Sequence, residues 1–373
     1  MSRVNVVRHG QRCWKGNPNG SGHMRGLRVR GRSGPTPSRV AHKLISWAIP
    51  GLVLLVPGCW DGPSPLGLSE LGEVSAVAVI GTRAAPDFAQ TGRLSLVVIP
   101  MHEGEVVAPQ AVREVTVHAE NGPTRGTVTG TRVREPRTDG EIAGAILLDS
   151  SGSMGWNDPR RLRVDAGQLF VDELERARQS KGVPFTLGVF DFGAGGTSGR
   201  FWYTRVLQEY TTDVEALRQG VARTTASGGT PLFGSAIEVI AELGQAFPGG
   251  AYRRIVLLLS DGEDNRPTAG TLDLVVDAAR THDVTIISVS LGQADERVLQ
   301  QMARESGGTS IKVEEAADLV YSVGLQAYPL TQSYLEADVR LNPVPPPGTA
   351  VALRLEVNTS FRPVSTRLVF TAP

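Results

Sequence analysis

Residues 142–154 read Ile-Ala-Gly-Ala-Ile-Leu-Leu-Asp-Ser-Ser-Gly-Ser-Met, an apolar run that ends in one carboxylate and three hydroxyls. A continuous apolar run is typical of a strand buried on both faces, as strands of parallel sheets are. Similar runs follow at 185–190, 255–259 and 284–289. Apolar residues at helical spacing separate them, as in a helix predicted over 161–180. This alternation predicts an α/β domain over 140–330, with a doubly wound, mostly parallel sheet.

Oxygen-bearing side chains follow the ends of these strands. Ligands of a doubly wound sheet bind in the loops beyond the carboxyl ends of the strands. From three such loops, 149–154, 227–232 and 260–265, we expect two aspartates and three Ser or Thr hydroxyls to meet at one point. Carboxylate and hydroxyl oxygens suit Mg²⁺ or Mn²⁺, and the absence of nearby histidine or cysteine disfavours zinc or copper.

The three loops carry a resemblance to a known family. Asp149, Ser151 and Ser153 match the D-x-S-x-S turn of the von Willebrand factor A domain, Thr230 its threonine loop and Asp261 its D-G aspartate. All five positions of that family's metal-ion-dependent adhesion site are thus present, and the resemblance covers about half of the chain. The alternative is that the first loop only caps a helix and the third is only a turn, which leaves the conjunction of three motifs unexplained.

The resemblance implies a mode of binding. Ser151, Ser153 and Thr230 would ligate Mg²⁺ or Mn²⁺ directly, while Asp149 and Asp261 would act largely through water or from behind the direct ligands. Because the direct ligands are neutral, the cation would seek a carboxylate from a partner protein. Trp156, Asn157 and Asp158 are expected to rim the metal and to select that partner, although Trp156 could equally pack on its own loop.

An enzymatic function is not expected. Beyond the first 59 residues the histidines are His102, His118 and His282, and none falls near the predicted site. Ser153 lacks the glycine two residues earlier that a nucleophile elbow requires. A metal-dependent hydrolase is the less favoured alternative. A structural or regulatory subunit of a cell-envelope complex stays open beside the protein-binding module.

The first 59 residues read as an export leader. Residues 1–43 hold ten Lys or Arg and no acidic residue, and the apolar stretch 44–56 is too short to span a membrane but suits a signal peptide. Val56-Pro57-Gly58-Cys59 resembles a bacterial lipobox, which predicts a lipid-anchored protein of the cell envelope, acylated at Cys59, with 60–73 as a tether. Secretion without a lipid is the alternative. Translation could start at Met1 or at Met24.

The charge and the cysteine content of the chain argue against nucleic-acid binding and against cysteine-based sites. The whole chain has 38 basic and 38 acidic residues, so without the leader 28 basic residues face 38 acidic ones. An acidic body disfavours nucleic acid as a partner, because binding to phosphates requires Lys and Arg. Cys13 and Cys59 both precede the folded body, which therefore contains neither a disulfide nor a thiolate metal site.

The segments on either side of the α/β domain are rich in β-branched residues. Segment 74–139 contains four short runs punctuated by Gly, Pro and Asn, and segment 331–373 contains three more. Four strands are few for a β-sandwich. We therefore expect the two flanks to form one β-sandwich-like domain around the inserted middle, with two separate β-appendages as the alternative.

Overall fold

The computed structural model describes residues 74–373 except 104, 138–139, 194–198, 262–263, 267, 292–295, 314–315 and 360–361. The predicted leader, the lipobox with Cys59 and the tether lie outside the described residues. Within the described residues, no helix is both long enough and apolar enough to cross a membrane.

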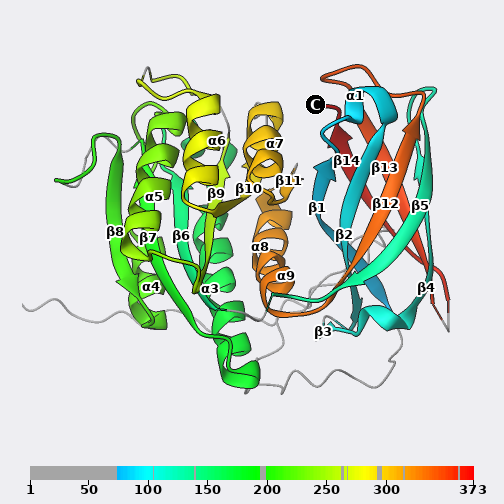
Figure 1. The fold of residues 1–373 in the computed structure, drawn as a ribbon, viewed down its shortest axis with the longest axis horizontal. Coiled ribbons are helices and arrows are strands. Elements are labelled where there is room, and N and C mark those ends of the chain that lie inside the picture. The colour runs from blue at the N-terminus through cyan, green and yellow to red at the C-terminus, as the bar shows by residue number, and fades with distance from the viewer. Residues whose placement is uncertain are drawn as a thin grey trace, which may run out of the picture. The chain divides into compact units, whose positions relative to one another are not determined.

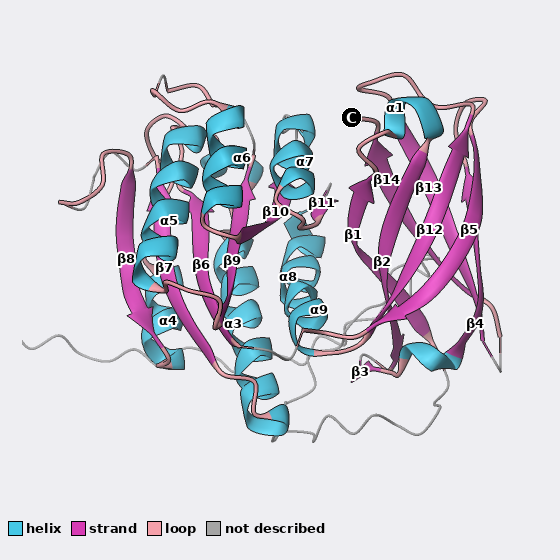
Figure 2. Ribbon diagram, in the orientation of Figure 1, coloured by secondary structure: helices cyan, strands magenta, loops and turns pink. Residues whose placement is uncertain are grey.

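Strands and helices alternate through the middle of the chain, and strands dominate both flanks (Figures 1 and 2). The strands are β1 (Ala76–Ala84), β2 (Arg93–His102), β3 (Glu105–Val106), β4 (Val112–Ala119), β5 (Arg125–Arg134), β6 (Glu141–Asp149), β7 (Phe185–Phe192), β8 (Thr204–Thr211), β9 (Tyr252–Ser260), β10 (Val284–Leu291), β11 (Ser310–Val313), β12 (Tyr334–Asn342), β13 (Ala350–Thr359) and β14 (Val364–Thr371). The helices are α1 (Phe88–Thr91), α2 (Met154–Asn157), α3 (Leu162–Lys181), α4 (Val214–Ala222), α5 (Leu232–Ala246), α6 (Leu272–Thr281), α7 (Glu296–Glu305), α8 (Ala316–Gly324) and α9 (Tyr328–Thr331), with 3-10 turns at Pro109–Ala111 and Leu325–Ala327.

The middle of the chain forms a mostly parallel sheet. Its strand order is β11-β10-β9-β6-β7-β8, and every neighbouring pair is parallel except β7 with β8. The prediction of a doubly wound α/β domain is therefore confirmed. Because β6 and β9 run in parallel with Leu148 opposite Leu259, the loops that follow them leave the sheet side by side.

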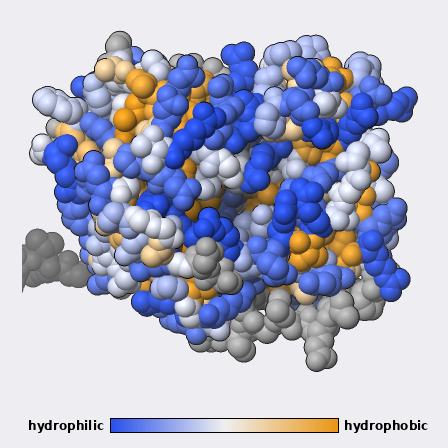
Figure 3. Space-filling view, viewed as in Figure 1, coloured by the Kyte–Doolittle hydropathy of each residue, from blue (hydrophilic) through white to orange (hydrophobic). Residues whose placement is uncertain are grey.

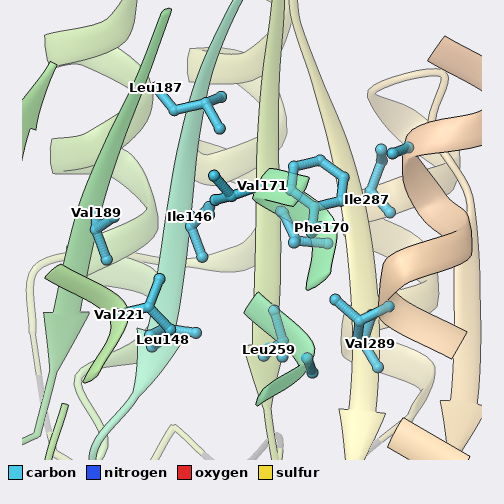
Figure 4. Close-up of a cluster of buried hydrophobic side chains, with 14 of the residues drawn as sticks. Ile146, Leu148, Phe170, Val171, Leu187, Val189, Val221, Leu259, Ile287 and Val289 are labelled. Carbon is cyan, nitrogen blue, oxygen red and sulfur yellow. The ribbon is translucent and has the colours of Figure 1, made fainter. Parts of the chain in front are cut away.

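Helices cover both faces of this sheet. Along β6, Ile146 and Leu148 pack in one core with residues of α3, α4 and α8, whereas Ala145 and Leu147 pack in a second core with α5, α6 and α7. Figure 4 shows the first core, where Phe170 and Val171 of α3 lie against strand side chains. Burying each large apolar side chain contributes about 1.5–3 kcal/mol, so burial on both faces explains the continuous apolar runs.

Strands from the two flanking segments pair with each other in two groups. β12 lies between β2 and β5, and β13 lies between β4 and β14, all antiparallel. Their apolar residues enclose one core that includes Leu96, Val117, Leu335 and Leu353. Thr82 of β1 is also paired with Ser310 of β11, which joins β1, β2, β12 and β5 to the parallel sheet. On the face drawn in Figure 3, hydrophobic residues lie in small patches among hydrophilic ones.

Candidate metal centre

Asp149 is fixed at the end of β6. The side chain is fully buried, and each of its carboxylate oxygens accepts a hydrogen bond. The amide of Ser151 donates to Oδ1 at 2.8 Å, and the hydroxyl of Ser260, at the end of β9, donates to Oδ2 at 2.7 Å. The Asp149 carboxylate thus links the first and third loops from below and shapes the turn that carries Ser151 and Ser153.

Two of the three hydroxyls predicted to be ligands lie close together, and the third is buried. The Oγ atoms of Ser151 and Ser153 lie 2.9 Å apart. The Thr230 hydroxyl is buried and has no hydrogen-bond partner within the described part of the chain. Its backbone is nevertheless held firmly, since the Thr230 amide donates to Oδ1 of Asn265 at 2.8 Å and its carbonyl accepts from the Asn265 amide at 3.2 Å. A buried hydroxyl without a partner costs about 1–3 kcal/mol, so its retention points to a ligand.

Asp261 adds a second carboxylate close to the first. It is 6% exposed, and Nδ2 of Asn157 donates to its Oδ2 at 2.9 Å. Burial, together with the nearby charge of Asp261, raises the pKa of Asp149 to about 6, against the hydrogen bonds from Ser151 and Ser260. Two buried carboxylates that repel each other are stabilised by a cation placed near both.

A hydrogen-bond network supports the first two loops from behind. The Ser150 hydroxyl donates to Asp191 at 2.7 Å and lies 2.5 Å from the Thr224 hydroxyl, while Arg205 holds the Asp191 carboxylate through two nitrogens. Backbone bonds from Ser227 to Ser150 and from Gly152 to Gly228 also join the two loops.

The sequence did not identify Asp191 and Asn265 as residues that support the site. Asp191 could have been singled out, because it is the one charged residue of the mostly apolar strand β7. Asn265 lies in the quoted third loop, but nothing in the sequence indicates that its side chain reaches Thr230, 35 positions earlier.

The three residues predicted to rim the metal have different environments. Trp156 is 84% exposed and thus does not pack on its own loop. Asn157 contacts Asp261 and so touches the site itself. The expectation that Asp158 meets a partner is wrong: its side chain is 1% exposed, pairs with Arg163 at 2.7 Å and accepts the amides of Leu162 and Arg163. The Asp158 carboxylate therefore caps the first turn of α3 and is not available to a partner.

The chemistry of the donors suits a hard divalent cation. Among the described residues, no cluster of three or more His, Cys, Asp or Glu side chains is placed to hold a metal ion. The candidate centre instead combines the carboxylates of Asp149 and Asp261 with hydroxyls, including that of Thr230, which has no partner in the described part of the chain. Oxygen donors of this kind fit Mg²⁺ or Mn²⁺ better than softer metals.

Comparison with solved structures finds several similar folds. A von Willebrand factor type A protein from Catenulispora acidiphila has a TM-score of 0.41 and 12% identity, covering 80% of this chain and 71% of that one. The pilus adhesin SpaC from Lactobacillus rhamnosus GG has a TM-score of 0.39 and 11% identity, covering 69% and 48%. Proximal thread matrix protein 1 from the mussel byssus, with a zinc-occupied MIDAS motif, has a TM-score of 0.37 and 18% identity, covering 52% and 48%.

Sequence comparison gives a more direct result. No curated protein sequence matches the chain. The family profile described as the von Willebrand factor type A domain matches residues 145–311, a range that begins within β6 and ends within β11. This range includes the first, second and third loops of the candidate centre. Residues 145–311 of the chain therefore match the von Willebrand factor type A domain.

Proposed function

We propose that this domain binds Mg²⁺ or Mn²⁺ and, through that ion, an acidic group of a partner protein. Ser151, Ser153 and Thr230 would hold the ion directly, and Asp149 and Asp261 would position those ligands and balance the charge. The observation that carries the proposal is the Thr230 hydroxyl, which is buried without a partner among the described residues, beside two loops bearing carboxylates. The ion would supply Lewis acidity and a coordination position for a carboxylate oxygen.

The expected partner follows from charge. Hydroxyl ligands are neutral, and the two carboxylates are already engaged by Ser260, the Ser151 amide and Asn157. A divalent ion held in this way keeps positive charge toward solvent and attracts an anionic oxygen. The exposed indole of Trp156, three residues after Ser153, offers an apolar surface beside that position.

A binding role is proposed in preference to a catalytic one. His102 and His118 lie on β2 and β4 of the flanks. His282 precedes β10, at the amino end of a parallel strand, whereas the candidate centre lies beyond the carboxyl ends. General acid–base catalysis by histidine would need a ring within hydrogen-bonding distance of the reacting group.

Calorimetric titration of Mn²⁺ tests the metal centre. Wild-type chain should bind one ion, and Asp149→Ala should lose most of the affinity because the turn that carries both serines loses its anchor. Glu114→Ala, a carboxylate on β4 of the flank, serves as the control and should bind like wild type. Equal Mn²⁺ affinity in wild type and Asp149→Ala would overturn the proposed centre.

We further propose that the protein is exported and held at a membrane of the cell envelope through acylated Cys59. Mass spectrometry of the native amino terminus should find a mature chain that begins at Cys59 and carries acyl groups. An unmodified amino terminus elsewhere in the chain would contradict the anchor.

A further inference from the structure

A cavity opens directly beside the candidate metal centre. It has a volume of about 420 Å³ and lies between the start of α3 and the segment that follows α4. Met154, which follows the metal ligand Ser153, lines one side, and Ala226, which precedes the threonine loop, lines another. Consecutive Cα atoms are about 3.8 Å apart, so the cavity begins within one residue of the metal-binding turn.

Arginine side chains give the cavity a positive charge. Arg161, Arg163 and Arg223 line it, and Asp158 is the one carboxylate among its described lining residues. Asp158 is committed to Arg163, at 2.7 Å, and both side chains are buried. That pair is neutral as a unit. Arg161 and Arg223 pair with no carboxylate within the described part of the chain, so two positive charges face the cavity without compensation.

Both of these arginines have donors to spare. Nη2 of Arg161 donates to the carbonyls of Ala222 and Thr224, at 2.8 and 2.7 Å, and its other nitrogens have no acceptor in the described residues. Arg223 donates from Nε to the Gln219 carbonyl and from Nη2 to Gln208, both longer than 3.1 Å. Deeper in the wall, Nε of the fully buried Arg163 also lacks a partner among the residues that the structure describes. A guanidinium has five N–H donors, and a carboxylate can accept two of them at once.

Arg161 has an unfavourable backbone conformation. Its φ of +57° lies in the left-handed region, which non-glycine residues rarely adopt. The bonds to Ala222 and Thr224 anchor the side chain across the cavity mouth, next to the chain that leads to Thr230. Arg161 is therefore a preorganised cation on the wall of a cavity that Met154, the residue after Ser153, also lines.

We propose that this cavity binds a second acidic side chain of the same partner segment whose first carboxylate binds the metal ion. The inference rests on the proposed function and narrows the partner to a segment with two acidic residues close together in sequence. One carboxylate would complete the coordination of the ion, and the other would accept from Arg161 and Arg223. A partner with one acidic residue would leave both arginines unpaired and would bind less tightly.

Synthetic peptides supply the test on the full-length chain with saturating Mn²⁺ at low salt. Glycine-serine peptides carry either one glutamate or two glutamates separated by one, two or three residues, and affinities come from fluorescence anisotropy. A charge-assisted hydrogen-bonded pair should favour at least one two-glutamate peptide by about tenfold over the one-glutamate peptide. Arg161→Gly, which suits the positive φ, and the exposed Arg223→Gln should each remove most of that advantage without changing Mn²⁺ affinity. Arg160→Gln, an exposed arginine that does not line the cavity, is the matched control and should keep the advantage.

The outcomes separate the two proposals. Peptide binding that survives a chelator would overturn the proposed function and this inference together. Metal-dependent binding with no preference for two glutamates at any spacing would overturn only the inference. A preference that persists in both Arg161→Gly and Arg223→Gln would also overturn it, because the second acid would then bind elsewhere.

Discussion

Replacing Thr230 with valine should change the stability of the chain in opposite directions with and without metal. Valine has nearly the shape of threonine but no hydroxyl, so the substitution removes the buried Oγ1 that has no partner in the described residues. The backbone bonds between Thr230 and Asn265 do not involve the side chain and should persist. The variant therefore isolates one proposed metal ligand.

The expected magnitudes follow from that single oxygen. An unsatisfied buried hydroxyl costs about 1–3 kcal/mol, so without metal Thr230→Val should be as stable as wild type or up to about 1 kcal/mol more stable. At an Mn²⁺ concentration a hundredfold above its dissociation constant, wild type gains about 2.7 kcal/mol. If the variant binds about a hundredfold more weakly, it gains only about 0.4 kcal/mol. With Mn²⁺, wild type should thus be more stable by about 1–2 kcal/mol.

Urea denaturation of wild type and Thr230→Val, once in EDTA and once in Mn²⁺, measures which of the two is more stable in each condition. Thr224→Val is the matched control, because its buried hydroxyl contacts Ser150 at 2.5 Å and its loss should destabilise the metal-free chain by about 1 kcal/mol. The reasoning is refuted if Thr230→Val is clearly less stable than wild type in EDTA and gains as much from Mn²⁺ as wild type does.

Three further changes test other parts of the argument. Asn157→Ala should weaken Mn²⁺ binding by about 10- to 100-fold in calorimetry, because it removes the donor that orients Asp261, and unchanged affinity would deny Asn157 that role. A chain that ends at Leu330 should lose protease resistance over residues 74–133, because β12 and β13 pair with β2, β5 and β4; an intact amino-terminal fragment would argue against one shared β-domain. Burial opposes ionisation of Glu336, but Arg134 and Arg132 hold its pKa below its ordinary value of 4.5, so its contribution to stability should be complete above pH about 4.5 and fade as the pH falls through the lowered pKa. Glu336→Gln should flatten that part of the stability profile in acid denaturation, and an unchanged profile would show that the pair with the two arginines is not responsible.

The sequence alone indicated the architecture of the middle of the chain, because strand burial and helix amphipathicity are local patterns. The run 142–148 lies within β6, and the helix predicted over 161–180 is α3, one residue later at each end. The position of the site followed as well, since parallel strands end at the same edge of a sheet. Helix α4 and strand β11 were not predicted, because elements of nine and four residues are short for a periodic pattern to stand out.

Tertiary structure decided which side chains meet and which are available. The contacts of Asn157 with Asp261 and of Thr230 with Asn265 span 104 and 35 positions, and no local pattern encodes them. In the sequence, nothing distinguishes the exposure of Asp158 from that of Trp156, two residues earlier. The carboxylate of Asp158 nevertheless turns inward at the start of α3 and pairs with Arg163. Likewise, the cavity beside the metal centre exists only because the ends of α3 and α4 converge. Local periodicity is a property of neighbouring residues, whereas burial, pairing and charge compensation depend on residues that folding alone brings together.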